Sequence, residues 1–197
     1  MPPPPTTEDE DRQAMVRLAS GHEASLDELM GRHAERLFHY LNRLLQDESE
    51  AADLAQEAFV RVYQHRARFN PAQKFSTWIY AIATNLARDR WRWRARRPEV
   101  PLDAKGSETG EDLGNQIPQP GVDPQAALIA AERGEMVREA IARLPEDLRV
   151  PLVLAEYEQQ SHEQIGAVLG CSAKAIEMRL YRARKQLREH LGRVLQT

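Results

Sequence analysis

Apolar residues recur at intervals of three and four along residues 9–97, which predicts four consecutive helices. The first is short, contains Met15 and Leu18, and is expected to end near Gly21. The second is long and has its apolar positions at Leu26, Leu29, Met30, Leu37, Tyr40, Leu41 and Leu44. The third carries Leu54, Ala58, Phe59 and Val62, and the fourth opens at Phe75 and carries Trp78, Ile79, Ile82, Ala83 and Leu86. No alternation typical of strands competes with this pattern, so the predicted fold class is all-α.

The helical pattern is interrupted between Pro98 and Pro124. This stretch holds five prolines and four glycines and shows little periodicity, as a linker does. Helical spacing resumes at Ala126, and a further helix is expected to start at residues 144–146, Leu-Pro-Glu. Pro151 lies about a turn inside that helix, so we expect it to delay the start of the helix or to kink it.

These patterns divide the chain into four parts. They are a Pro-rich, acidic and disordered N-terminus (1–8), a helical domain (9–97), a linker (98–124) and a second helical domain (125–197). We therefore expect two small all-α domains joined by a flexible acidic linker, the C-terminal one a helix-turn-helix.

The basis for the helix-turn-helix is residues 161–191. Ser161 and Gln164 have the spacing of a capping box, which predicts the start of a short helix. Gly170 follows at the position of a sharp turn, and Ser172 can cap a second helix. The positions of the second helix that are expected to face inward are Ile176, Leu180, Ala183, Leu187 and Leu191.

The opposite side of this second helix is basic. It carries Lys174, Met178, Tyr181, Arg182 and Lys185, with Arg179 and Arg184 on its flanks. Two short helices joined by a glycine turn, the second with a basic outer face, form a motif that can enter the major groove of DNA. A surface helix with solvated charges is the alternative, but turn, caps and basic face agree on DNA binding.

The net charge of −3 conceals a strong segregation of charge along the chain. Residues 88–97 hold six arginines and one aspartate, and residues 174–193 hold seven basic and two acidic side chains. Between them, residues 98–124 hold six acidic residues and one lysine, and residues 8–11 form a further acidic cluster. Two basic segments separated by an acidic connector indicate a polyanion that is bound at two places.

Aromatic and basic residues are interleaved in residues 69–94. They are Phe69, Phe75, Trp78, Tyr80, Trp91 and Trp93, among Lys74, Arg88, Arg90, Arg92 and Arg94. Single-stranded nucleic acids bind such surfaces through base stacking and phosphate contacts. Aromatic residues at helical spacing also form cores, and this alternative applies to Trp78 and Phe75. Trp91 and Trp93 stand two positions apart on a helix and cannot share one buried face, so at least one is expected to be exposed.

Acidic residues begin the third helix, at residues 47–50, and Asp53, Gln56 and Glu57 follow. Asp53 and Glu57 lie one turn apart on a face that the apolar positions do not use. This face can be solvated, can bind a divalent metal, or can dock a basic protein surface.

Cysteine usage and hydropathy exclude several classes of protein. Cys171 is the only cysteine, so an internal disulfide is excluded, and its place at the turn favours a small buried residue over a nucleophile. No apolar run is long enough to span a bilayer and residues 1–5 are not a signal peptide, so we expect a cytoplasmic protein. We expect no catalytic residue, no metal and no cofactor.

Two sets of motifs resemble the sigma factors of bacterial RNA polymerase. Residues 53–63 (DLAQEAFVRVY) resemble the second region of these proteins, and residues 75–89 (FSTWIYAIATNLARD) are similar to their promoter-melting segment. Residues 144–146 and the helix-turn-helix, which ends with Arg-Ala-Arg at 182–184, resemble their fourth region. The short linker without a third domain matches the extracytoplasmic-function (ECF) group. The resemblance covers residues 10–97 and 125–191.

The resemblance implies a role for each surface. Asp53, Gln56 and Glu57 would face the clamp helices of the polymerase β′ subunit. The loop from Phe69 to Lys74 and the start of the next helix would capture a flipped base of the minus-ten element, because a base edge is readable in a pocket only after unstacking. The implied minus-ten contacts are Phe69, Asn70, Lys74, Phe75, Trp78, Asn85, Arg88 and Arg92. The implied minus-thirty-five contacts are Ser172, Lys174, Glu177, Met178, Arg179, Tyr181, Arg182 and Lys185.

The implied partners are core RNA polymerase, through its β′ clamp helices and its β subunit, promoter DNA, and an anti-sigma factor. The acidic linker would thread the channel that RNA later uses. The recognition helix departs from the family in two places. Glu177 stands where many relatives carry a lysine and can accept a hydrogen bond from a cytosine amino group, and Lys174 replaces a common small residue. The DNA sequence that relatives prefer at the minus-thirty-five element is therefore not assumed for this chain.

Two other functions are alternatives to that of a sigma factor. A stand-alone helix-turn-helix regulator explains residues 161–191 but gives no role to the acidic helix or to the Arg/Trp segment. An all-α metal-dependent phosphohydrolase with Asp53 and Glu57 as ligands needs further converging carboxylates, and Glu28 and Glu35 are not arranged convincingly. We therefore expect a non-enzymatic sigma factor that docks on core polymerase, recognises and melts promoter DNA and directs transcription initiation.

Overall fold

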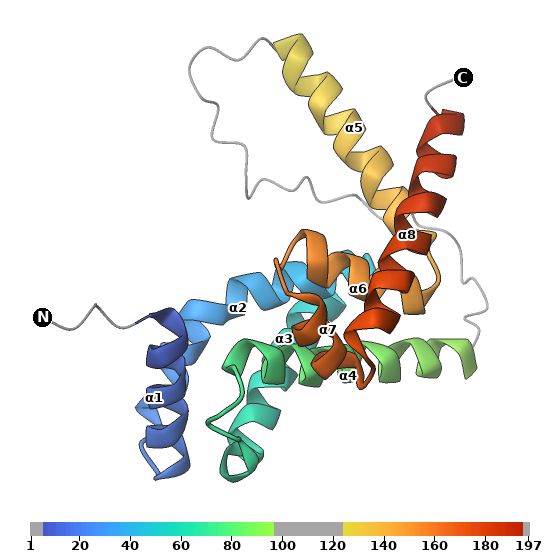
Figure 1. The fold of residues 1–197 in the computed structure, drawn as a ribbon. Helices are drawn as coiled ribbons and strands as arrows, with labels where there is room; N and C mark the ends of the chain where they lie inside the picture. Colours follow the sequence, from blue (N-terminus) through green and yellow to red (C-terminus); the bar gives the residue numbers. More distant parts are fainter. Residues whose placement is uncertain (1–5, 97–123, 195–197) are drawn as a thin grey trace, which may run out of the picture.

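The computed structural model describes residues 6–96 and 124–194, and every regular element in these two ranges is a helix (Figure 1). The elements are α1 (Thr7–Ala19), α2 (Ala24–Leu45), α3 (Glu48–Gln64), the 3-10 turn η1 (Arg66–Arg68), α4 (Phe75–Arg96), α5 (Pro124–Ala142), α6 (Glu146–Glu156), α7 (His162–Leu169) and α8 (Ala173–Val194). The predicted all-α fold class is confirmed.

Helices α1 to α4 surround one apolar core. α2 packs against α1, α3 and α4, and Leu37, Leu41 and Leu44 on its apolar side are buried. Inside this core the hydroxyl groups of Tyr40 on α2 and Thr84 on α4 form a hydrogen bond of 2.7 Å. Burial raises the pKa of Tyr40 far above its ordinary value, so its hydroxyl stays protonated.

The N-terminal boundary differs from the expected one. Residues 1–8 were expected to be disordered, but α1 begins at Thr7; residues 1–5 lie outside the described ranges. The Thr6 hydroxyl accepts from the backbone N–H of Asp9, and the Asp9 carboxylate accepts from the backbone N–H of Thr6, both at 3.3 Å. Because of this capping box, α1 begins at Thr7, before the residues whose apolar spacing predicted a helix. The Asp9 carboxylate also accepts from the Thr6 hydroxyl at 2.8 Å, and this hydrogen bond, with the one from the Thr6 N–H, lowers the pKa of Asp9.

The linker expected at 98–124 lies outside the described ranges except for its last residue. Pro124 is the first residue of α5, where its fixed φ and missing N–H are no disadvantage. The expected effect of Pro151 is wrong in part, because α6 begins at Glu146 without delay and contains Pro151. The partner that Pro151 cannot reach is the carbonyl of Asp147 in the first turn, so a single hydrogen bond is lost.

The helix-turn-helix is formed by α7 and α8. Ser161 Oγ accepts from Gln164 N at 3.3 Å, Gln164 Oε1 accepts from Ser161 N at 2.7 Å, and Gly170 ends α7 at φ 67°. Ser172 Oγ accepts from Ala175 N at 3.2 Å and caps α8. Of the inward positions of α8, Ile176, Leu180 and Ala183 are buried and Leu187 and Leu191 are half-buried. Cys171, which was expected to be buried, is also half-buried.

The two groups of helices lie against one another, α7 on α4 and α6 on α2 (Figure 1). Glu158, which follows α6, is 4% exposed and accepts a hydrogen bond from the Tyr80 hydroxyl on α4. Arg149 Nη1 donates to the carbonyl of Leu44 at 2.9 Å. We call this packing the closed arrangement. The hydrophobic pattern predicted both groups but not their contact, in which buried apolar residues of the two groups form one cluster and polar side chains such as these pair across it.

Candidate nucleic-acid interface

The acidic face of α3 is open to solvent. Asp53 and Gln56 are exposed, and Glu57 is half-buried and accepts from Arg61 Nε at 3.0 Å. Val60 lies one turn further along the same face and is 46% exposed, although it is apolar. The sequence analysis missed Val60; its spacing of three and four residues from Glu57 and Gln56 is the signal that would have found it. The acidic side chains and the exposed valine of this face are accessible to a partner.

The loop between η1 and α4 rests on an aromatic cluster. Phe69 and Phe75 are buried, and Trp78 is half-buried, with its ring centroid 5.2 Å from that of Phe69. The two phenylalanines therefore support the loop from within the core, and neither offers a stacking face in this arrangement. Of the implied minus-ten contacts in this loop, Asn70 and Lys74 are the exposed ones.

Some arginines in the second half of α4 are already paired with acidic side chains of the protein. Arg94 Nη2 lies 2.7 Å from Glu50 Oε2, and Arg90 Nε lies 3.0 Å from Glu50 Oε1, so both arginines are bound to the start of α3. Trp93 is 38% exposed and lies under the Arg90 guanidinium, whereas Trp91 is half-buried. The expectation that at least one tryptophan is exposed is confirmed.

The implied strand contacts of α4 have different surroundings. Asn85 and Arg92 are exposed, and Arg92 pairs with Asp89 on its own helix. Arg88 is half-buried, and its Nε lies 2.7 Å from Glu146 at the start of α6. In the closed arrangement Arg88 is therefore bound to the second group of helices.

The outer face of α8 is accessible along its length. The exposed implied contacts in and before this helix are Ser172, Lys174, Glu177, Met178, Tyr181, Arg182 and Lys185. Met178 and Tyr181 are 44% and 59% exposed, and apolar side chains of this size on a DNA-reading helix can contact base edges. Arg179 is half-buried, with its Nη1 3.7 Å from Cys171 Sγ.

Lys174 and Glu177 form a pair at the start of α8, with Lys174 Nζ 2.8 Å from Glu177 Oε2. The hydrogen bond from Lys174 is the main cause that lowers the pKa of Glu177, so this carboxyl stays charged at neutral pH. Each residue thus partly neutralises the other, and a substitution of either one changes the charge that the other presents at the surface.

The described ranges show no candidate for a metal site. No group of three or more His, Cys, Asp or Glu side chains there is arranged to hold a metal ion. No helix in these ranges is long and apolar enough to cross a membrane.

Known proteins with a similar sequence match both groups of helices. The model of sigma-70 region 2 matches residues 29–97, and that of sigma-70 region 4 matches residues 134–187. The RNA polymerase sigma-H factor of Pseudomonas aeruginosa is 32% identical over 190 residues, which are 96% of this chain and 97% of that protein. The ECF RNA polymerase sigma factor SigW of Bacillus subtilis is 32% identical over 181 residues, 91% of this chain and 96% of that protein.

Solved structures agree with these matches. CnrH in complex with the cytosolic domain of CnrY superposes with a TM-score of 0.69 and 26% identity, over 93% of this chain and 98% of that one. RpoE of Bartonella quintana, in complex with the anti-sigma factor NepR, has a TM-score of 0.63 and 20% identity, over 84% of this chain and 96% of that one, and shows the shared fold. The alternatives of a stand-alone regulator and of a phosphohydrolase are not favoured. The chain belongs to the ECF group of RNA polymerase sigma factors, which direct promoter-specific transcription initiation.

Proposed function

We propose that the three exposed surfaces divide the work of a sigma factor between them. The acidic face of α3 docks on core polymerase, the loop 69–74 with α4 engages the minus-ten element, and α8 reads the minus-thirty-five element. The observation that supports this assignment is that each surface presents exposed polar side chains, Asp53 and Gln56 on α3, Asn70, Lys74, Asn85 and Arg92 around α4, and Lys174, Arg182 and Lys185 on α8.

The docking surface would consist of Asp53, Gln56, Glu57 and Val60. Its charge suits the basic β′ clamp helices of the polymerase, and Val60 adds apolar area that is removed from water on binding. Glu57 is held by Arg61, so Asp53 is the more available carboxylate of the two.

The minus-ten surface would be built from exposed polar side chains on an aromatic support. Lys74 and Arg92 supply phosphate contacts, Asn70 and Asn85 supply hydrogen bonds to bases, and Trp78 offers the edge of a half-buried ring. Phe69 and Phe75 hold the loop in shape instead of touching DNA. Arg88 becomes available to the strand only when Glu146 moves away from it.

The second group of helices would also take an anti-sigma factor. RpoE of Bartonella quintana, which shares the fold, was solved with such a partner. An apolar groove of about 670 Å³ lies between α5, α6 and α8, lined by Ile141, Leu152, Tyr157, Leu180 and Leu187 among others. A groove of this kind fits the apolar face of a partner helix. We further propose that the protein acts in the cytoplasm, where core polymerase is, and has no catalytic activity of its own.

Run-off transcription tests the proposed function. The protein is added to core RNA polymerase with a library of genomic fragments, and the transcripts are sequenced. We expect discrete start sites that share two sequence elements upstream. Transcripts without a shared upstream element, or none above the background of core enzyme, would contradict the proposal.

A further inference from the structure

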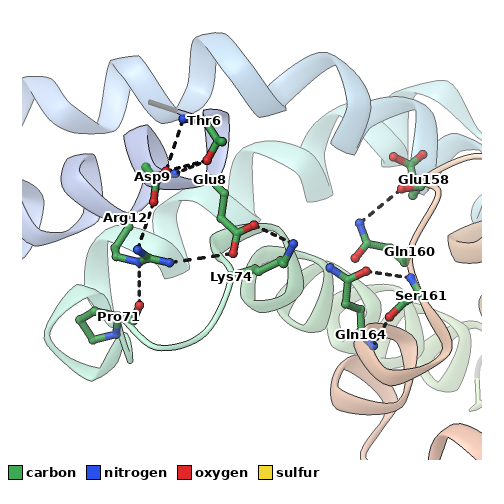
Figure 2. A network of polar contacts seen from close by, with 10 residues as sticks. All are labelled: Thr6, Glu8, Asp9, Arg12, Pro71, Lys74, Glu158, Gln160, Ser161 and Gln164. Atoms are coloured by element: carbon green, nitrogen blue, oxygen red, sulfur yellow. Dashed lines mark hydrogen bonds and ion pairs between the residues drawn. The ribbon is translucent and has the colours of Figure 1, made fainter. Parts of the chain in front are cut away.

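The first turn of α1 contacts the loop that carries Lys74. Glu8 Oε2 lies 2.6 Å from Lys74 Nζ, and Glu8 Oε1 lies 3.9 Å from Arg12 Nη2. Arg12 Nε donates to the carbonyl oxygen of Pro71 at 2.9 Å, and Figure 2 shows Arg12 between Asp9, Glu8 and Pro71. α1 therefore holds both ends of the segment from Pro71 to Lys74.

The position of α1 is itself determined by buried contacts. Asp11 is 3% exposed, accepts from Arg32 Nε at 2.8 Å and lies 2.6 Å from His33 Nε2, and both partners belong to α2. Glu8 precedes Asp11 by three residues and so lies on the same side of α1. The folded structure thus places the Glu8 carboxylate over the loop.

The α1 residues that make these contacts, Glu8, Asp11 and Arg12, lie outside the part of the chain that the family models match. The match to sigma-70 region 2 begins at residue 29, after α1 has ended. Neither the similarity to that region nor the proposed role of Lys74 assigns a function to Glu8.

A carboxylate at 2.6 Å occupies the place beside the Lys74 ammonium that a phosphate oxygen of DNA would take. Two anions at that place would repel each other, so DNA and Glu8 compete for Lys74. The side chains of Lys74 and Glu8 are 45% and 37% exposed, and exposed pairs of this kind are weak and reversible. We propose that Glu8 is an internal mimic of a DNA phosphate, which holds Lys74 in the free protein and is displaced by the minus-ten strand. This proposal rests on the proposed role of Lys74.

The substitution Glu8→Gln tests the competition, because it removes the charge and keeps the size of the side chain. Binding is measured with holoenzyme by fluorescence anisotropy. The probe is the fluorescein-labelled non-template minus-ten strand that wild-type holoenzyme selects from a random library. We expect Glu8→Gln to bind about two- to fivefold more tightly at low salt, and the gain to shrink as salt rises. Glu10→Gln is the control, since Glu10 is exposed in the same turn; its gain should be much smaller.

The substitution Lys74→Ala separates this proposal from the proposed function. If Lys74 contacts a phosphate, Lys74→Ala weakens binding and lowers the salt slope by about 0.7, and Glu8→Gln then has no further effect in that background. Unchanged binding in Lys74→Ala would refute the role of Lys74, and the phosphate mimic with it. Weaker binding in Lys74→Ala together with no gain in Glu8→Gln would overturn the mimic alone. The mimic would also be overturned if Glu8→Gln tightened binding in the Lys74→Ala background, or if Glu10→Gln tightened binding as much as Glu8→Gln does.

Discussion

At the scale of single residues, some acidic side chains of α3 and α8 are paired with a basic neighbour on the same helix. Asp53 is exposed, whereas Glu57 shares its charge with Arg61, and Glu177 shares its charge with Lys174. Exposed pairs of this kind contribute little to stability. Substitutions at these positions are therefore expected to report on binding rather than on folding.

Asp53→Arg and Glu57→Arg are expected to weaken binding to core polymerase by about tenfold or more, because a cation would face the basic clamp helices. The measurement is competition with labelled wild-type protein for core enzyme, with thermal melting to show an unchanged fold. Glu35→Arg on α2 is the control; its side chain is 89% exposed and lies on a different helix. Normal competition by both α3 variants would show that this face does not dock.

Glu177→Ala is expected to relax the preference at one base pair of the upstream element, at a cost of about 1–3 kcal/mol on the favoured sequence. The reason is the loss of an acceptor for a cytosine amino group. Lys174→Ala is expected to weaken binding to all sequences. A promoter library selected in parallel with wild type, Glu177→Ala and Glu177→Gln measures both effects. If Glu177→Ala instead tightens binding to every sequence alike, then Glu177 acts only by holding Lys174.

At the scale of elements, the sequence predicted what depends on local chemistry. The capping box of Ser161 and Gln164, the left-handed Gly170 and the Ser172 cap are all present, because each is formed within a few residues of chain. The early start of α1 was missed because its capping box precedes any apolar pattern. The burial of Phe75 was left open, because helical spacing alone does not separate a core position from a stacking platform.

The surroundings of two glycines, Gly166 at the tight turn between α7 and α8 and Gly192 near the end of α8, predict opposite effects of an alanine substitution on stability. A Cβ on Gly166 would lie 2.6 Å from the Cys171 carbonyl oxygen, whereas a Cβ on Gly192 would meet nothing within 4 Å. Gly166→Ala is expected to destabilise the helix-turn-helix by about 1–3 kcal/mol, because the backbone of the turn must move. Gly192→Ala is expected to stabilise α8 by about 0.5–1 kcal/mol. Thermal unfolding of the two variants measures both; equal melting temperatures would contradict the close packing.

At the scale of the whole molecule, the contact between the two groups of helices was not predictable from the sequence. Its partners are far apart in the chain, such as Arg36 and Tyr80 against Glu158. Neither hydrophobic periodicity nor net charge specifies which polar side chains meet across such a distance. The same holds for the ion pairs of Arg90 and Arg94 with Glu50 on α3, which join residues about 40 positions apart in the chain.

Tyr80→Phe is expected to weaken the closed arrangement by about 1–3 kcal/mol, because Glu158 would be left buried without the hydroxyl that donates to it. Small-angle X-ray scattering should show a larger radius of gyration than for wild type. Tyr40→Phe is the matched control, since it removes a buried hydroxyl whose partner, Thr84, lies within the first group of helices. An increase of equal size in both variants would show general loosening instead of a specific contact.

The position of α7 on α4 also limits how much of a promoter the closed chain can touch. The positions minus ten and minus thirty-five differ by about 25 base pairs, which correspond to about 85 Å of DNA, whereas a helix of the length of α8 measures only about 33 Å. α8 begins at Ala173, directly after the turn that follows α7, so in the closed arrangement its start is tied to α7, which packs on α4. The 27 residues from 97 to 123 would reach about 90 Å if fully extended. The two groups of helices must therefore separate before one molecule can contact both promoter elements. Only a partner that holds the two groups apart by the distance between the elements allows this.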